Sequence, residues 1–95
     1  MPPKFEWDNN KSYSNLKKHK FSFLEIEKLC ASTHLQDILD TGRKYNEDRF
    51  LSIIYRNDLK PILLSYCYRN NEQTVRFISA RLATNPELEE FRSYS

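Results

Sequence analysis

Four arginines lie in or beside segments that alternate like β-strands, and they could bind phosphate. They are Arg49, Arg69, Arg76 and Arg81. The guanidinium group is planar, stays charged and can donate two parallel hydrogen bonds to one anion. If antiparallel pairing brings the strands together, the four groups could converge on one phosphate of a polyanion. Taken singly, each could equally be a surface residue in a weak ion pair.

Proton transfer has two candidates, His19 and Glu47. Histidine ordinarily titrates near neutral pH, and Glu47 stands two residues before Arg49. Each also has a structural interpretation, His19 as the cap of a helix and Glu47 as part of a solvated acidic turn. With Lys18 as a further cation, the set could supply a proton acceptor, a proton donor and cations that stabilise charge developing on a phosphate.

Aromatic side chains could add contacts to unpaired bases. The candidates for base stacking are Tyr45, Tyr55, Tyr66 and Tyr68. Aromatic residues are also enriched in strands, so packing within a sheet is the alternative for most of them.

The sequence contains no pattern typical of a metal or cofactor site. Its single glycine excludes the glycine-rich loops that bind nucleotide phosphates. Cys30, Cys67, His19 and His34 carry zinc-ligating atoms, but they lack the close ligand pairs of a structural zinc site. We therefore expect neither a metal nor a cofactor.

Two helices are expected before the strands. Asp8 is a candidate N-cap for a helix over residues 9–19, with Tyr13 and Leu16 on its apolar side and a basic last turn. The next helix should begin at Phe23, because Ser22 and Glu25 have the spacing of a capping box. Its apolar residues recur at helical spacing and should face inward: Phe23, Ile26, Leu29 and Cys30.

Strands fill the middle of the chain, and a third helix follows them. The segments that alternate or are rich in β-formers are Phe5–Trp7, Leu35–Leu39, Arg49–Tyr55, Ile62–Tyr68 and Thr74–Ser79. Thr84 and Glu87 form a second capping box, with a proline in the first turn, before Leu88 and Phe91. The fold class is therefore α+β: an antiparallel β-sheet with two N-terminal helices and one C-terminal helix packed against one sheet face.

Length and charge limit the remaining possibilities. A chain of 95 residues forms one domain, over residues 1–95, because it buries too little surface for two cores. The longest uncharged run, 61–68, is much shorter than the roughly 20 residues that span a bilayer. With no signal-peptide pattern, we expect a cytoplasmic protein without membrane contact. Residues 43–81 carry eight Lys or Arg against four acids, a net charge of +4, which favours a polyanionic partner.

A series of fragments occurs in order along nearly the whole chain. The fragments are Phe5–Asp8, Lys11, Asn15, Lys18–His19, Ser22–Phe23 with Glu25, Glu47, Arg49–Phe50, Arg76–Arg81, Ala83–Thr84 and Glu87. Together they resemble the BrnT family of bacterial toxins. The chain departs from the expected pattern in two turns that lack glycine, at residues 56–61 and 69–72.

The resemblance implies a RelE-like ribonuclease toxin fold and a type II toxin that cleaves RNA, most simply mRNA, and so inhibits translation. It also implies a BrnA-type DNA-binding antitoxin that neutralises the toxin. The candidate catalytic set is then Lys18, His19, Glu47, Arg49, Arg69, Arg76 and Arg81.

A second function remains open from the sequence alone. The chain could be a non-catalytic RNA-binding module, or a partner subunit of a repressor complex. Both functions need the basic sheet, but only a ribonuclease needs an acid and a base beside it.

Overall fold

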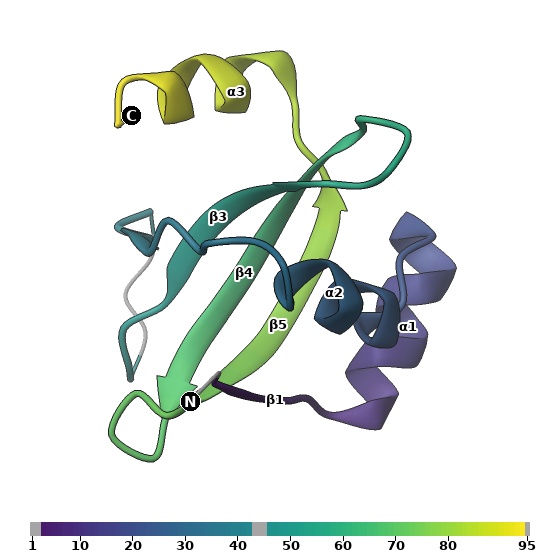
Figure 1. Cartoon of the computed structure of the whole chain (residues 1–95), viewed down its shortest axis with the longest axis vertical. Helices are drawn as coiled ribbons and strands as arrows, with labels where there is room; N and C mark the ends of the chain where they lie inside the picture. The colour runs from purple at the N-terminus through teal and green to yellow at the C-terminus, as the bar shows by residue number, and fades with distance from the viewer. Residues whose placement is uncertain (1–2, 43–45, 95) are drawn as a thin grey trace.

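A mixed five-stranded sheet organises the part of the chain that the computed structural model describes, residues 3–42 and 46–94. The elements are β1 (Lys4–Glu6), α1 (Asn9–His19), α2 (Phe23–Cys30), β2 (Ile38–Leu39), β3 (Phe50–Tyr55), β4 (Pro61–Arg69), β5 (Thr74–Leu82) and α3 (Asn85–Arg92). The strand order is β1-β5-β4-β3-β2, as Figure 1 shows for its central strands. No helix among these residues is long and apolar enough to cross a membrane.

The α+β class and the three helices are confirmed, and the strand orientation differs in one place. β1 pairs with β5 in parallel, whereas the pairs β2–β3, β3–β4 and β4–β5 are antiparallel. Short hairpins force antiparallel pairing on β3, β4 and β5. The chain between β1 and β5 is long and includes two helices, so no tight turn imposes that orientation.

The two faces of the sheet are covered by different helices. On one face, Ile54 and Leu64 pack into the main core with Phe23 and Ile26 of α2. On the other face, their strand neighbours Ile53 and Leu63 pack against Phe91 and Leu88 of α3. The prediction that all helices pack against one sheet face is therefore wrong. β3 and β4 carry apolar residues at consecutive positions, so both faces need cover.

The first helix packs against the edge of β5 through a polar side chain. The Asn15 amide accepts a hydrogen bond from Ala80 N at 3.0 Å and donates to Ala80 O at 2.8 Å. Asn15 therefore bonds to the edge of β5 as a neighbouring strand would. The predicted apolar side of the helix is wrong, since Tyr13 and Leu16 are 63% and 44% exposed. The inward face of α1 is set instead by the buried Asn15 amide, which bonds to the edge of β5.

Local signals at the helix ends are confirmed. Asp8 accepts hydrogen bonds from the first turn of α1, and Ser22 Oγ accepts one from Glu25 N at the start of α2. The full reciprocal capping box forms at α3, between Thr84 and Glu87. At α2 the Glu25 carboxylate lies 3.9 Å from Arg56 instead.

Candidate functional site

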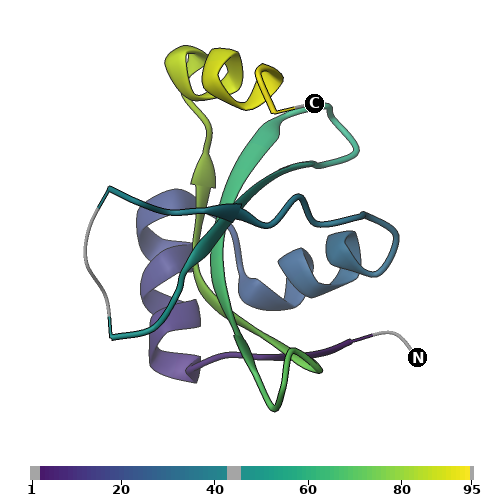
Figure 2. The same cartoon turned by 90° about the vertical axis from the view of Figure 1, so that its left-hand side faces the viewer.

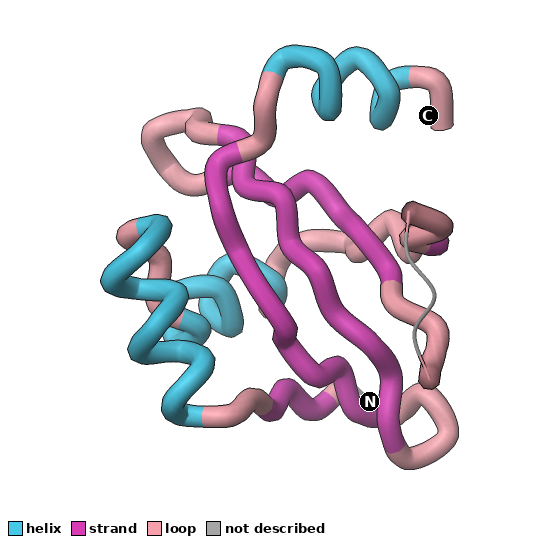
Figure 3. The backbone as a smooth tube through the Cα atoms, turned by 180° about the vertical axis from the view of Figure 1, so that it is seen from behind, coloured by secondary structure: helices cyan, strands magenta, loops and turns pink. Residues whose placement is uncertain are grey.

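Strand pairing places the four candidate arginines on one side of the sheet, which we call the arginine face. In β4 and β5, Cys67 lies opposite Arg76, Arg69 opposite Thr74, and Leu63 opposite Arg81. Arg49 directly precedes β3 and shares the side of Leu51 by alternation. Figure 3 views this side, and no helix crosses the middle or lower part of the strands. Arg76 thus points away from the core that holds its neighbours Val75 and Phe77, as predicted.

A bulge in β5 makes this arrangement possible. Arg76 and Arg81 are five residues apart, so regular alternation would place them on opposite faces. The register shifts where Ser65 pairs with Ser79 and Tyr66 pairs with Phe77, which leaves Ile78 as the extra residue. The bulge returns Ser79 and Arg81 to the side of Arg76.

The candidates form two groups at opposite ends of the arginine face. The Glu47 end comprises Glu47, Arg49, Arg69 and Arg76, and the Arg81 end comprises Arg81 together with Lys18 and His19 of the neighbouring helix α1. At the Glu47 end the residues lie on neighbouring strands, only about 5 Å apart from one strand to the next. Arg76 and Arg81 are separated by roughly 15 Å along β5, at about 3.3 Å per residue. One phosphate therefore cannot contact both ends.

The placement of Lys18 and His19 follows from the direction of α1. Asn15 is level with Ala80, and His19 lies one helical turn further on. α1 and β5 run the same way, so the end of α1 lies beside the end of β5 near Arg81 (Figure 1). Lys18 is exposed and His19 is half-buried. The two residues suggested for proton transfer, His19 and Glu47, are thus at opposite ends of the face.

Three of the arginines form ion pairs with carboxylates from other parts of the fold. The pairs are Arg69 with Glu47, Arg76 with Glu6 at 2.6 Å, and Arg81 with Glu87 at 2.7 Å. Glu6 and Glu87 were not among the candidates, although strand and capping-box patterns had marked the segments that contain them. These ion pairs depend on which strands and helices lie side by side, so the sequence alone does not indicate them.

Glu47 and Arg69 form a bidentate salt bridge at the end of β4. Both guanidinium nitrogens of Arg69 donate to the Glu47 carboxylate, Nη2 to Oε1 at 3.1 Å. The Cys67 sulfur lies 3.0 Å from Arg69 Nη1. Hydrogen bonding from Arg69 lowers the pKa of the Glu47 carboxyl, with a smaller contribution from the charge of Arg49. Glu47 is therefore ionised at neutral pH and can accept a proton.

The Arg81 end is tied to α3. Arg81 donates to both oxygens of Glu87, at 2.9 and 2.7 Å, and Glu87 also accepts a hydrogen bond from Thr84 N in the capping box. These hydrogen bonds lower the pKa of Glu87 to about 2, and the bond from Arg81 has the largest effect. The same carboxylate thus fixes the start of α3 and orients Arg81.

The candidate tyrosines differ in how accessible they are to a nucleic-acid base. Tyr66 is fully buried, and Tyr55 is 54% exposed at the far end of β3. Tyr68 is half-buried beside the Glu47 end, where it lines a hollow with Glu47 and Arg69. Tyr45 lies outside the described residues.

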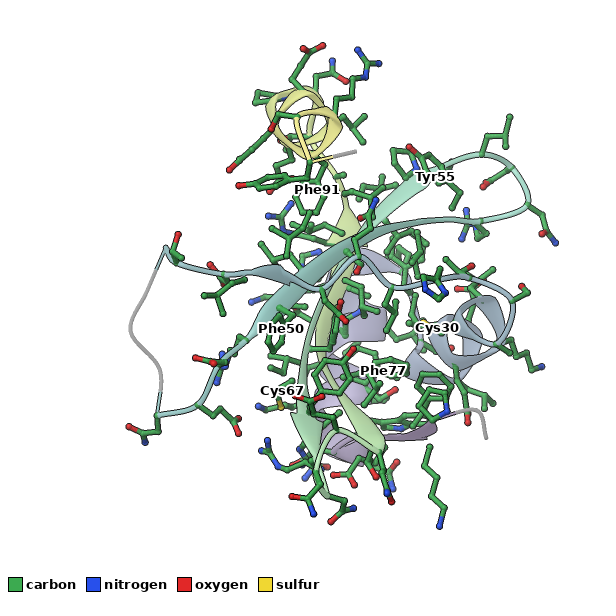
Figure 4. All side chains as sticks on the ribbon, turned by 60° about the vertical axis from the view of Figure 1, so that its left-hand side comes forward. Cys30, Phe50, Tyr55, Cys67, Phe77 and Phe91 are labelled. Carbon is green, nitrogen blue, oxygen red and sulfur yellow. The ribbon has the colours of Figure 1, made fainter. Side chains whose placement is uncertain are left out.

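The described residues, 3–42 and 46–94, contain no cluster of three or more His, Cys, Asp or Glu side chains that could hold a metal ion. Cys30 and Cys67, two of the four residues considered for zinc, lie on opposite sides of the strands (Figure 4). Burial raises the pKa of the Cys30 thiol to about 12, so it stays protonated.

Comparison with known proteins gives a family match and a structural match. The family described as "Ribonuclease toxin, BrnT, of type II toxin-antitoxin system" matches residues 7–87. Among solved structures, the chain is similar to the Brucella abortus ribonuclease toxin BrnT, with a TM-score of 0.59 and 21% sequence identity over 87% of this chain and 99% of that chain. This likeness shows a shared fold. No match is found among curated protein sequences.

Proposed function

The chain belongs to the BrnT family of ribonuclease toxins of type II toxin–antitoxin systems, and we propose that it is a metal-independent endoribonuclease whose cleavage of mRNA inhibits translation. We assign the reaction to the Glu47 end of the arginine face. The assignment rests mainly on one observation: an ionised carboxylate bonds to Arg69 and interacts with Arg49, beside the sheet face that also carries Arg76. A non-catalytic RNA-binding surface would not need that carboxylate.

In the proposed reaction the substrate supplies the nucleophile. The ribose 2′-oxygen attacks the adjacent phosphorus while Glu47 accepts the 2′-hydroxyl proton. A bond forms between the 2′-oxygen and phosphorus, and the bond from phosphorus to the 5′-oxygen breaks. The leaving oxygen takes up a proton, and the products carry a 2′,3′-cyclic phosphate and a 5′-hydroxyl. Arg49, Arg69 and Arg76 stabilise the negative charge that develops on the phosphate oxygens.

Ion-pair exchange would couple RNA binding to base strength. In the free protein, the hydrogen bonds from Arg69 lower the pKa of Glu47 and weaken it as a base. A phosphate that binds Arg69 competes with the carboxylate for the same donors. As those hydrogen bonds move to the phosphate, the pKa of Glu47 rises towards its ordinary value. The carboxylate therefore becomes a stronger base when substrate is in place.

The Arg81 end then serves the rest of the RNA chain. Its separation of roughly 15 Å from Arg76 fits contact with phosphates away from the cleaved bond. Lys18 and Arg81 would follow the RNA backbone as cations, and His19 would contact the same stretch. Such contacts contribute affinity without sequence preference.

The partner we propose is an antitoxin of the BrnA type, which would bind DNA with one part and cover the arginine face with an acidic segment. Opposite charges speed association, so the association rate should fall as salt rises. A rate that is independent of ionic strength would place the contact on an apolar surface instead.

The decisive experiment uses an RNA oligonucleotide that has one preferred cleavage position. A single 2′-deoxy substitution at that nucleotide should stop cleavage there and leave binding intact, because phosphate contacts dominate affinity. Cleavage of the unmodified RNA should continue in excess chelator and yield the cyclic phosphate. Cutting at the 2′-deoxy position, or a requirement for Mg²⁺, would contradict the mechanism. Arg76→Ala should fold normally and lose cleavage, and it should still bind RNA, although more weakly.

A further inference from the structure

A hollow of about 440 Å³ adjoins the Glu47 end where β4 passes into the β4–β5 turn. Its lining includes Glu47, Asp48, Phe50, Tyr68, Arg69 and Asn71. Glu47 and Arg69 thus belong both to the proposed reaction centre and to the wall of the hollow. A group in the hollow would therefore contact Glu47 and Arg69 at the end of the sheet, next to the proposed reaction centre.

Two aromatic rings, those of Phe50 and Tyr68, line the hollow from the main-core side of the sheet, because these residues alternate along their strands with Arg49 and Arg69. The rings of Phe50 and Tyr68 meet edge to face, with centroids 5.5 Å apart. The Tyr68 hydroxyl donates to Asp37 Oδ1 at 2.6 Å, and burial together with this bond raises the pKa of Tyr68. The ring is therefore neutral and held in one orientation. A half-buried, fixed ring is a suitable surface for stacking a base.

Hydrogen-bond acceptors dominate the polar part of the hollow. Asp48, Asn71 and Glu72 line it and are exposed, so their polar groups can reach a ligand. One N–H of the Asn70 side-chain amide donates to Thr74 Oγ1 at 3.0 Å, which leaves the second N–H and the amide oxygen for a ligand. A ligand with N–H donors on one edge fits this set.

The turn that carries these groups has an unusual backbone. Asn70, Asn71 and Glu72 have φ angles of 54°, 56° and 68°, in the left-handed region that glycine normally occupies. Asparagine tolerates this region, but glutamate does so at a cost. The glycine-free turn noted in the sequence therefore adopts the left-handed conformation and keeps side chains that border the hollow.

From these observations we propose that the hollow is a subsite for one of the two bases that flank the cleaved bond, and that it prefers guanine. Guanine presents two adjacent N–H donors, N1–H and the N2 amino group, which one carboxylate can accept in parallel. Adenine and cytosine present one donor beside an acceptor, and uracil presents one donor between two acceptors. Each would direct an acceptor at the carboxylates. This proposal rests on the proposed ribonuclease function.

The first test compares RNA oligonucleotides that differ at the two nucleotides flanking the cleaved bond. Guanine at one of these positions should raise the cleavage rate about tenfold over adenine, cytosine or uracil. Inosine, which lacks only the N2 amino group, should lose most of that gain. Equal rates for guanine and inosine, or no preference at either position, would overturn the proposal. If no RNA is cleaved at all, the proposed function fails instead.

The second test assigns the preference to the hollow. Asp48→Asn and Asn71→Ala should reduce the preference for guanine over inosine at least about threefold. Glu27→Gln is the matched control, because it removes a charge from α2 on the opposite side of the sheet. Thermal unfolding of each variant checks that the fold is intact. An unchanged preference in both folded variants would refute the assignment.

Discussion

The two ends of the arginine face contain the same kind of ion pair, yet the pairs have different structural duties. At the Arg81 end, Glu87 belongs to the capping box of α3, so its carboxylate bonds to the helix start as well as to Arg81. At the Glu47 end, the carboxylates come from the segment before β3 and from the edge strand β1, and cap no helix there. Figure 2 shows α3 at the upper end of the sheet, far from β1.

This difference separates a structural role from a chemical one. An arginine whose partner also caps a helix is held in place, and releasing it would disturb α3. An arginine paired with an exposed carboxylate can exchange that partner for a phosphate at little cost, because such pairs contribute about 0–1 kcal/mol. We therefore expect changes at the Glu47 end to alter activity and changes at the Arg81 end to alter stability.

The largest expected effect is that of Glu47→Gln. The amide keeps the shape of the side chain but cannot accept the 2′-hydroxyl proton, so cleavage should fall about 100-fold or more. Single-turnover cleavage and RNA binding should be measured together. Binding should be unchanged or tighter, because Arg69 is freed for phosphate. Glu27→Gln on α2 is the control. Full activity of Glu47→Gln would show that another residue is the general base, with His19 as the next candidate.

At the Arg81 end we expect a loss of stability with little change in the chemical step. Glu87→Ala removes both the ion pair and one half of the capping box and should cost about 1–2 kcal/mol of unfolding free energy. Glu87→Gln can still cap the helix and should cost less than half as much. Glu89→Gln, an exposed carboxylate on the same helix, should change little. Thermal unfolding measures all three, and equal melting temperatures would contradict the structural role.

The pH dependence of stability gives the same contrast. The pKa of Glu87 is about 2 in the folded protein against an ordinary 4.5. The charged carboxylate therefore stabilises the fold fully above about pH 4.5, and this contribution is lost as pH falls towards 2. Unfolding of Glu87→Gln should depend less steeply on pH over that range than unfolding of the parent protein. An identical slope would show that the pair does not contribute.

Sequence reasoning succeeded where local signals determine structure. Asp8, Ser22 and Thr84 each begin a helix because their side chains bond to backbone within the next turn, and such contacts depend on a few neighbouring residues. It failed where distant partners decide. Asn15 faces inward because it bonds to the edge of β5, 65 residues away, and nothing in α1 alone indicates that edge.

The candidate site shows the same limit. Arginine content predicted that arginines would gather on the sheet, but the bulge at Ile78 could not be foreseen, and without it Arg76 and Arg81 would lie on opposite faces. The order of strands, which brings β1 beside β5, also determines that Glu6 pairs with Arg76. Neither the register nor the bulge is contained in the spacing of the arginines along the chain.

A smaller effect, opposite in sign, is expected at Glu6. Its carboxylate lies 2.6 Å from Arg76 and occupies donors that a phosphate would use. Glu6→Gln should therefore raise RNA affinity several-fold at low salt. The charge-matched Glu27→Gln should raise affinity less, since it changes net charge without freeing an arginine. Equal gains in the two variants would mean that net charge alone matters and that the ion pair does not mask Arg76.

The smallest effect is expected at Lys18, and it separates backbone contact from chemistry. Lys18 is exposed in the last turn of α1, which ends beside the end of β5 near Arg81. If it contacts one phosphate, Lys18→Ala should weaken RNA binding equally for different sequences and lower the slope of log affinity against log salt by about 0.7, the value for a single-stranded contact. The cleavage rate at saturating RNA should stay the same. Lys28→Ala, on α2, removes the same charge from the opposite side of the sheet and should leave the slope unchanged. A fall in the saturated rate for Lys18→Ala would place Lys18 at the reacting phosphate and remove the distinction between the two ends.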